Sequence, residues 1–265
     1  MSNHLIIGQY VPGQSIIHRL DPRAKLLIVF AYVLIVFLAN NAATYALLSV
    51  FAFLFAALSR IPFSYIMRGL RPVIWVVLFT FVLHVWMTKE GDVLYRIGAL
   101  TIYEEGVRQG IFISLRFLLL VLMTTMLTLT TTPIEVTDGV ESLLGPLKKM
   151  RVPVHELALM MAISLRFIPT LMEETEKIMK AQAARGVDFS GGRFSERMKA
   201  IVSLLVPLFI SSFKRADELA TAMEARGYRG GEGRTKFRQL AWKRTDTVFF
   251  AAVVLLAILL CLLRS

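Results

Sequence analysis

The sequence predicts an all-α membrane protein with about five transmembrane helices and long cytoplasmic helices. Three observations support this fold class. The 265-residue chain is 56% hydrophobic and only 18% charged, with a mean hydropathy of +0.62, whereas soluble domains are roughly half apolar and about a quarter charged. The apolar residues gather in runs that approach the length of a bilayer crossing. Lys and Arg, which give a formal net charge of +11, concentrate beside and between these runs, as anchoring to anionic lipid requires.

Five apolar runs are the predicted transmembrane helices, at 26–39, 42–58, 73–87, 110–129 and 248–263. The first three are shorter than the roughly 20 residues that cross a hydrocarbon core, so we expect them to use flanking residues or a thinned bilayer. The run at 26–39 begins only after Arg19, Arg23 and Lys25. This approach is long for a signal peptide, so we interpret the run as a retained helix.

The charges between the runs predict the orientation. Basic residues precede the first run and separate the second from the third, at Arg19, Arg23, Lys25, Arg60, Arg68 and Arg71. Uncharged Asn40 and Asn41 join the first two runs, and the segment between the third and fourth runs carries charges of both signs. Because cytoplasmic loops hold the excess of Lys and Arg, the N-terminus is expected in the cytoplasm, and five crossings place the C-terminus outside.

A long segment, 132–246, then falls on the cytoplasmic side and holds 19 of the 30 Lys and Arg residues. We therefore divide the chain into an N-terminal membrane region of four spans (1–131), a cytoplasmic region (132–246) and a C-terminal transmembrane helix (247–265). Thr132-Pro133 followed by Glu135 predicts a helix start, and Gly145-Pro146 predicts an interruption. We expect helices only in this region.

Two long helices dominate the cytoplasmic region. One opens after Pro153 and contains Pro169, and the other covers about 195–226 and contains Pro207. Each has an apolar first part, 157–168 and 201–209, followed by a charged second part. An apolar surface this broad is unsuited to water, so the apolar parts are expected to pack on or into the membrane.

Both long helices end in the same three residues, Ala184-Arg185-Gly186 and Ala225-Arg226-Gly227. Each arginine continues a stripe at heptad spacing, which consists of Leu171 and Ile178 in the first helix and of Ser212 and Leu219 in the second. A glycine after a helix can adopt the left-handed conformation that ends it, and a cation in the last turn complements the helix dipole. The tripeptide thus places a guanidinium on a rigid, slim helix end, where it can bind carboxylates or helix-end carbonyls of a partner.

An Arg-Gly pair can also be a helix stop with no further role, and for a single copy this is the simpler interpretation. Two copies, at the ends of the two long cytoplasmic helices, favour docking to a partner. The same segments carry a resemblance to a known family. Its motifs are Leu20-Asp21-Pro22-Arg23-Ala24-Lys25-Leu26, Leu165-Arg166-Phe167-Ile168-Pro169 and the two Ala-Arg-Gly tripeptides. Together they resemble the EcfT family, the transmembrane components of energy-coupling factor (ECF) transporters, over nearly the whole chain.

The resemblance implies a transmembrane coupling subunit of an ABC-type importer in a bacterial cell membrane. In that family two ATPase subunits each receive one of the two helix ends, which implies that Arg185 and Arg226 enter the ATPase grooves. A substrate-binding S-component, which chooses the vitamin or metal, would lie on the apolar parts of the long helices. The residues that we expect to touch it are Leu157, Met160, Met161, Leu204, Leu205 and Leu208. ATP binding by the partners would move the two helix ends relative to each other and so tilt or release the S-component.

The residues point to no catalytic, metal or cofactor site in the chain itself. The sequence contains no Gly-x-x-x-x-Gly-Lys-Ser/Thr, so ATP is expected to be bound by separate subunits. The four histidines lack metal-ligand spacing, and His84 is expected to be a packed, hydrogen-bonded residue. Nucleic acid is a poorer partner than membrane lipid, because the positive charge adjoins apolar runs. No nucleophile with its base is evident, which argues against a membrane-anchored enzyme.

Four further features of the sequence bear on function or packing. The apolar runs contain no Asp or Glu, which disfavours an ion-coupled carrier. Arg116 lies within the fourth run and is either a protein-facing functional charge or a residue near the outer boundary that reaches the headgroups. Asp21-Pro22 is expected to cap the first helix, with Arg23 and Lys25 at the lipid headgroups. Gly106 and Gly110 have the spacing of a close helix contact.

Overall fold

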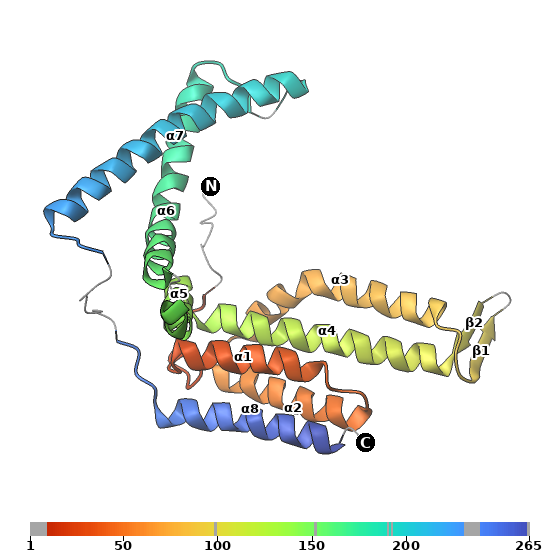
Figure 1. The fold of residues 1–265 in the computed structure, drawn as a ribbon. Coiled ribbons are helices and arrows are strands. Elements are labelled where there is room, and N and C mark those ends of the chain that lie inside the picture. Colours follow the sequence, from red (N-terminus) through yellow and green to blue (C-terminus); the bar gives the residue numbers. More distant parts are fainter. Residues whose placement is uncertain are drawn as a thin grey trace. The chain divides into compact units, whose positions relative to one another are not determined.

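The computed structural model describes residues 10–97, 100–150, 153–189, 191, 193–230 and 239–263. Helices form almost all of this part of the chain, so the predicted all-α fold class is confirmed (Figure 1). The elements are α1 (Pro22–Val36), α2 (Ala42–Ser59), α3 (Phe63–Met87), β1 (Val93–Ile97), β2 (Leu100–Tyr103), α4 (Glu104–Thr130), α5 (Pro133–Leu143), the short 3-10 helix η1 (Gly145–Met150), α6 (Val154–Ala184), α7 (Phe194–Ala225) and α8 (Arg244–Leu263).

The chain forms two compact units, Met1–Leu143 with Gln239–Ser265, and Leu144–Arg238. Helix α5 belongs to the first unit because it packs closely on the start of α1: a Cβ at Gly139 would lie 2.9 Å from Cδ1 of Leu26. The units therefore divide the chain at different positions from the regions predicted on membrane topology, 1–131, 132–246 and 247–265. Which segments lie in the membrane and which in the cytoplasm stays a prediction.

Five helices of the described residues are long and apolar enough to cross a membrane: α2, α3, α4, α6 and α8. The predicted number is the same, but the membership differs. The run at 26–39 forms α1, whose 15 residues reach about 22 Å, less than the roughly 30 Å of a hydrocarbon core. Helix α1 stops at Val36, so a crossing by this run needs the flanking residues or the thinned bilayer expected from the sequence. Helix α6 joins the candidates through its apolar first part.

Helix α1 supplies the centre of the first unit and contacts α4, α5 and α8. Its inward face is fully buried, with Ile28 and Tyr32 both at 0% exposure. The Tyr32 hydroxyl donates to the carbonyl of Leu48 in α2 at 3.0 Å, which satisfies the one polar group that this side chain brings into the core. Leu119 of α4 and Leu260 of α8 complete the same hydrophobic cluster. Within a bilayer, van der Waals packing of these side chains, and not their removal from water, holds the helices together.

Helix α3 begins at Phe63, ten residues before the predicted start, and packs mainly on α4. Glycines bring the two helices close at both ends of their contact. A Cβ at Gly69 would lie 2.7 Å from Thr125, and one at Gly110 would lie 3.0 Å from the Phe81 ring. The close helix contact predicted from the spacing of Gly106 and Gly110 is therefore present.

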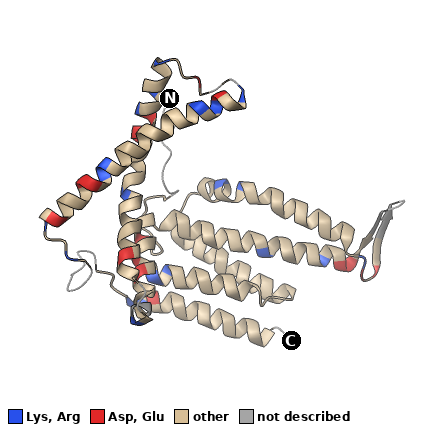
Figure 2. Ribbon diagram, turned by 45° about the horizontal axis from the view of Figure 1, so that its top comes forward, with Lys and Arg blue, Asp and Glu red and all other residues tan. Residues whose placement is uncertain are grey.

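A short antiparallel hairpin of β1 and β2 separates α3 from α4, with Val93 opposite Tyr103 and Ile97 opposite Leu100. Only helices were expected from the sequence, so these strands differ from the prediction. Figure 2 shows the charge distribution: the helices of the first unit carry few charges along their length, whereas acidic and basic residues recur along α6 and α7.

Candidate functional site

The first Ala-Arg-Gly tripeptide ends α6 in a Schellman motif. Arg185 is the C-cap residue and Gly186 follows with φ +88°. The Gly186 amide donates to the carbonyl of Ala183 at 3.0 Å, and the Val187 amide donates to that of Gln182 at 3.1 Å. These two bonds satisfy carbonyls that the helix end would leave without a partner.

The second tripeptide ends α7 with the same pair of bonds. Arg226 is the C-cap residue and Gly227 has φ +75°. The Gly227 amide donates to the carbonyl of Glu224 at 2.8 Å, and the Tyr228 amide donates to that of Met223 at 3.0 Å. The repetition in sequence is thus a repetition of backbone geometry.

Both helix ends, residues 184–186 and 225–227, are exposed and are called the tips below. Arg185 and Arg226 are exposed, and the alanine and glycine beside each of them are exposed as well. A Cβ at either glycine would meet nothing within 4 Å. Glycine is therefore required at these positions for its left-handed conformation and not for lack of space.

The heptad stripes of α6 and α7 have the burial that the sequence predicts. Leu171 and Ile178 on α6 are half-buried, as are Ser212 and Leu219 on α7. In each helix the stripe ends at the exposed arginine. The stripes thus belong to the packed sides of these helices, and the arginines continue them beyond the packing.

Polar contacts fix the crossing of α6 and α7, which Figure 1 shows within the second unit. Arg215 and Glu174 form an ion pair at 2.8 Å, and the Ser211 hydroxyl lies 3.4 Å from the same carboxylate. The Gln182 side-chain amide donates to the Ser203 carbonyl at 3.2 Å. Because later residues of α6 meet earlier residues of α7, the helices run in opposite directions across the contact. The two tips therefore point away from the crossing on different sides.

The ion pair lies at the same distance from both tips. Arg185 follows Glu174 by 11 residues, and Arg226 follows Arg215 by 11 residues. At 1.5 Å per residue, each arginine is about 16 Å along its helix from the ion pair. The two tips are thus the ends of two arms of equal length.

The structure does not gather the residues predicted for the S-component surface into one patch. Leu157, Met160 and Met161 of α6 are exposed, at 44%, 55% and 46%. On α7 Leu205 is 40% exposed, whereas Leu204 and Leu208 are half-buried. Ser203, next to Leu204, contacts Gln182, which lies 21 residues from Met161, or roughly 30 Å along α6.

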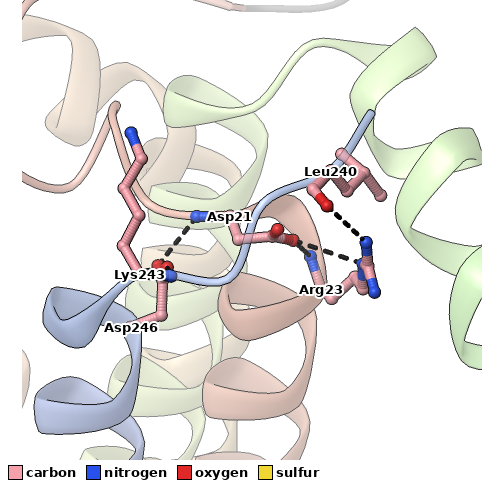
Figure 3. A network of polar contacts seen from close by, with 5 residues as sticks. All are labelled: Asp21, Arg23, Leu240, Lys243 and Asp246. Carbon is pink, nitrogen blue, oxygen red and sulfur yellow. Dashed lines mark hydrogen bonds and ion pairs between the residues drawn. The ribbon is translucent and has the colours of Figure 1, made fainter. Parts of the chain in front are cut away.

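The motif at residues 20–26 joins the start of α1 to the start of α8 (Figure 3). Asp21 caps α1 by accepting from the Arg23 amide at 2.9 Å, as predicted. The Asp21 amide in turn donates to the fully buried Asp246 at 2.8 Å. Figure 3 shows the Arg23 side chain between Asp21 and the carbonyl of Leu240, to which it donates at 3.0 Å. The motif is therefore a structural joint between segments far apart in the sequence.

The prediction that Lys25 lies at the lipid headgroups is wrong. The Lys25 side chain is buried, at 1% exposure. Its ammonium donates to the carbonyls of Thr130 at 2.8 Å and His18 at 3.2 Å. The Thr130 carbonyl belongs to the last turn of α4, where a cation also complements the helix dipole.

Arg116 and His84 have partners within the protein. Arg116 donates to the Tyr45 hydroxyl at 3.1 Å and to the Ala39 carbonyl at 3.3 Å, and it lies over the Phe37 ring. Of the two interpretations of Arg116, these contacts support the protein-facing one. The His84 ring donates to the Thr80 carbonyl at 2.9 Å, so the prediction of a hydrogen-bonded histidine is confirmed.

Sequence reasoning missed the residues that hold the crossing, Glu174, Gln182, Ser203 and Arg215. Their pairing joins two helices, and no spacing along one helix reveals it. The one available signal was Pro207, which lacks an amide hydrogen and so leaves the Ser203 carbonyl in need of another donor.

Comparison with known proteins places the chain in a family. The model of the family CbiQ, cobalt transport protein, matches residues 13–237. An energy-coupling factor transporter transmembrane protein EcfT from Bacillus subtilis is 64% identical over 265 residues, which is the full length of both chains. The protein of that name from Listeria innocua is 54% identical, again over both full lengths. The one from Streptococcus thermophilus is 50% identical over 98% of this chain and 99% of its own.

The family match covers most of the chain, and these relatives, which bear one name, are about half or more identical to the chain over almost their entire length. The resemblance seen in the motifs is thereby confirmed. The chain belongs to the CbiQ family, and within it to the EcfT transmembrane components of energy-coupling factor transporters.

Proposed function

We propose that this chain couples ATP hydrolysis by two ATPase subunits to the uptake of a vitamin or metal ion through a substrate-binding S-component. One observation carries the proposal: two long helices end in the same exposed arginine, each with the same glycine cap. The chain itself binds no ATP in this proposal and catalyses nothing. Its task is to transmit motion between its partners.

Each arginine docks into a groove of one ATPase subunit. A guanidinium offers five donors in a fixed planar fork, which suits carboxylates and carbonyl groups at helix ends. The glycine cap holds the end of the helix in one conformation, so less freedom is lost on docking. Arg185 and Arg226 are exposed at these ends, where a partner can reach them.

The crossing of α6 and α7 is the element that transmits motion. Both arms reach about 16 Å from the Glu174–Arg215 ion pair, so a change in the separation of two docked ATPase subunits acts equally on both. Rotation of the helices about this contact then moves their apolar parts. The S-component binds there, on side chains that include Leu157, Met160 and Leu205, which are exposed despite being apolar.

The proposed orientation places the N-terminus, α6 and α7 on the cytoplasmic side and the C-terminus outside. Helix α6 has the lowest mean hydropathy of the five candidate spans, 1.3 against 1.8 to 2.7 for the others. Its second part carries many charges, which disfavours a full crossing. With α6 left on the cytoplasmic surface, the charges of the loops follow the positive-inside rule.

Neutralising the two arginines tests the proposal in the assembled transporter. Arg185→Gln and Arg226→Gln are each expected to lower the yield of ATPase subunits that co-purify with the chain and to lower ATP-dependent uptake. The double variant is expected to lose both. Lys180→Gln and Arg229→Gln remove exposed charges near the same tips and serve as matched controls. Normal assembly and uptake in the double variant would rule the proposal out.

A further inference from the structure

An open apolar groove runs between α3 and α4 in the first unit. Its volume is about 440 Å³, and its walls include Ile74, Leu78 and Phe81 of α3 with Leu115 and Leu118 of α4. Ser114 also lines it, but its hydroxyl donates to the backbone carbonyl of Val77 at 3.4 Å. The side chains of this wall therefore favour hydrocarbon.

The groove lies between two close contacts of these helices. They meet closely where Gly69 faces Thr125 and again where Gly110 faces Phe81. Between these two contacts the groove is lined by larger apolar side chains, among them Ile74, Leu78 and Leu118. Pro72 lies two residues before Ile74, the first α3 residue of the groove, and this end of the groove is called its head. Pro72 removes one backbone hydrogen bond from α3.

Positive charge lies at that head. Arg71 precedes Ile74 by three residues and Leu78 by seven, so it lies on the stripe of α3 that lines the groove. Arg68, one turn earlier, is also exposed, and its guanidinium lies 5.5 Å from the centre of the Tyr65 ring. An anion held at Arg71 and Arg68 would thus be continuous with the apolar wall.

The groove taken together with Arg71 matches one leaflet of a bilayer in length. From Arg71 to Phe81 the helix rises about 15 Å, which is half of the roughly 30 Å hydrocarbon core. A molecule with an anionic head at Arg71 and a tail that reaches Phe81 is therefore as long as a lipid in that leaflet.

We infer that this groove binds an anionic phospholipid, with its phosphate at Arg71 and Arg68 and one acyl chain between α3 and α4. A partner helix fits less well. Close approach of a second helix requires small residues at the surface, whereas Trp75 and Phe79 beside the groove are 74% and 65% exposed. These large side chains keep another backbone away but leave a slot for a hydrocarbon chain.

Native mass spectrometry of the purified full-length protein tests the inference, with dioleoyl phosphatidylglycerol and dioleoyl phosphatidylcholine as probes. The unmodified chain is expected to hold one phosphatidylglycerol at least tenfold more tightly than phosphatidylcholine, because charge-assisted bonds to phosphate add to burial of the chain. Arg71→Gln is expected to remove most of this preference. Leu78→Trp, which fills the groove, is expected to weaken binding of both lipids.

Two variants serve as controls, and thermal unfolding verifies that every variant is folded. Val82→Trp adds the same ring at an exposed α3 residue outside the groove, and Arg108→Gln removes an exposed charge near the other end of α4. Both are expected to bind phosphatidylglycerol like the unmodified chain. Equal retention of the two lipids by the unmodified chain, or equal binding by Leu78→Trp and Val82→Trp, would overturn the inference.

A protein occupant is distinguished by labelling in the assembled transporter. Leu78→Cys is placed in a chain whose exposed Cys261 is replaced by Ser, and a hydrophobic maleimide is the probe. The inference expects equal labelling in the complex and in the isolated chain, both in phosphatidylglycerol vesicles. Protection in the complex alone would show that a partner subunit fills the groove, and would overturn it.

Discussion

The side-chain amide of Gln182 on α6 donates to the backbone carbonyl of Ser203 on α7 at 3.2 Å. In a regular helix that carbonyl would accept from the amide four residues later, but residue 207 is proline and has no amide hydrogen. Gln182 therefore supplies the donor that the α7 backbone lacks. One side chain both compensates for a helix irregularity and holds the crossing of the two long helices.

Gln182→Ala is expected to destabilise the α6–α7 contact by about 1 kcal/mol, because it leaves a half-buried carbonyl without a partner. The cost is expected to vanish in Pro207→Ala, which restores the helical donor to Ser203. A double-mutant cycle on the thermal unfolding of the full chain measures the coupling. Additive effects of the two substitutions would show that Gln182 does not act through this carbonyl.

Alanine at Gly186 or Gly227 is expected to cost about 1–2 kcal/mol in the folding of that helix end, because both glycines are left-handed. Hydrogen exchange at the amides of Val187 and Tyr228 reports the opening of each cap. Gly145→Ala is the matched control, because Gly145 also has open space around its Cβ position but no positive φ. Equal protection in all three variants would contradict the assignment of the caps.

The sequence predicted what depends on neighbours along the chain. The cap at Asp21, the ends of the long helices near Arg185 and Arg226, and the start of α5 all follow from local rules of helix capping and dipole. Helix α5 begins as expected, with Thr132 and Glu135 bonding each other's amides. The apolar runs located α2, α4 and α8 closely because composition alone defines a span.

What the sequence did not reveal depends on partners far along the chain. Nothing near Asp21 indicates that Asp246 accepts from its amide, and nothing near Lys25 indicates that it is buried against Thr130. Because Lys25 lies beside an apolar run, it was predicted to lie at the headgroups. Its bond to the Thr130 carbonyl at the end of α4 shows that this prediction is wrong. The hairpin of β1 and β2 was missed because strands of only five and four residues leave a much weaker pattern in the sequence than long apolar helices do.

Exchanging the two charges of the Glu174–Arg215 ion pair is expected to preserve the contact of α6 with α7, whereas removing one charge is expected to weaken that contact modestly. Glu174→Gln or Arg215→Gln is expected to cost about 0.2–1 kcal/mol, because the pair is partly exposed to solvent. Glu174→Arg with Arg215→Glu is expected to recover part of this loss. Distances between spin labels on α6 and α7 measure the crossing, and Glu176→Gln, exposed on the same helix, is the control.

Asp246→Ala is expected to be among the most destabilising single substitutions in the first unit. It removes the acceptor from two backbone amides, those of Asp21 at 2.8 Å and Lys243 at 2.6 Å. Each amide left without a partner in this buried joint costs roughly 1–3 kcal/mol. Thermal unfolding of the full chain measures the loss, and Asp217→Ala, exposed on α7, is expected to change stability little. Similar effects of the two would contradict the joint.

The segment before α1 is expected to lose stability in mild acid because of His18. Its Nε2 donates to the Val11 carbonyl at 3.0 Å, since a carbonyl only accepts, and its Nδ1 then accepts from the Ser15 hydroxyl at 2.7 Å. Burial lowers the pKa of His18 below the ordinary 6.5, the bond to Val11 opposes this change, and the charge of Lys25 adds to it. The neutral ring is therefore the form that the folded segment favours.

The sign of the pH effect follows from that direction. Below pH 6.5 the unfolded segment binds a proton that the folded segment resists, so stability declines as the pH falls through this range and is constant above it. Hydrogen exchange at the Val11 amide, which donates to the Leu129 carbonyl at 3.0 Å, reports the attachment of the segment to α4. After correction for the intrinsic exchange rate, protection is expected to fall between pH 7.5 and pH 5.5 in the unmodified chain. In His18→Gln, which has no titrating ring, protection is expected to be lower and independent of pH, and an equal pH dependence in both proteins would contradict the role of His18.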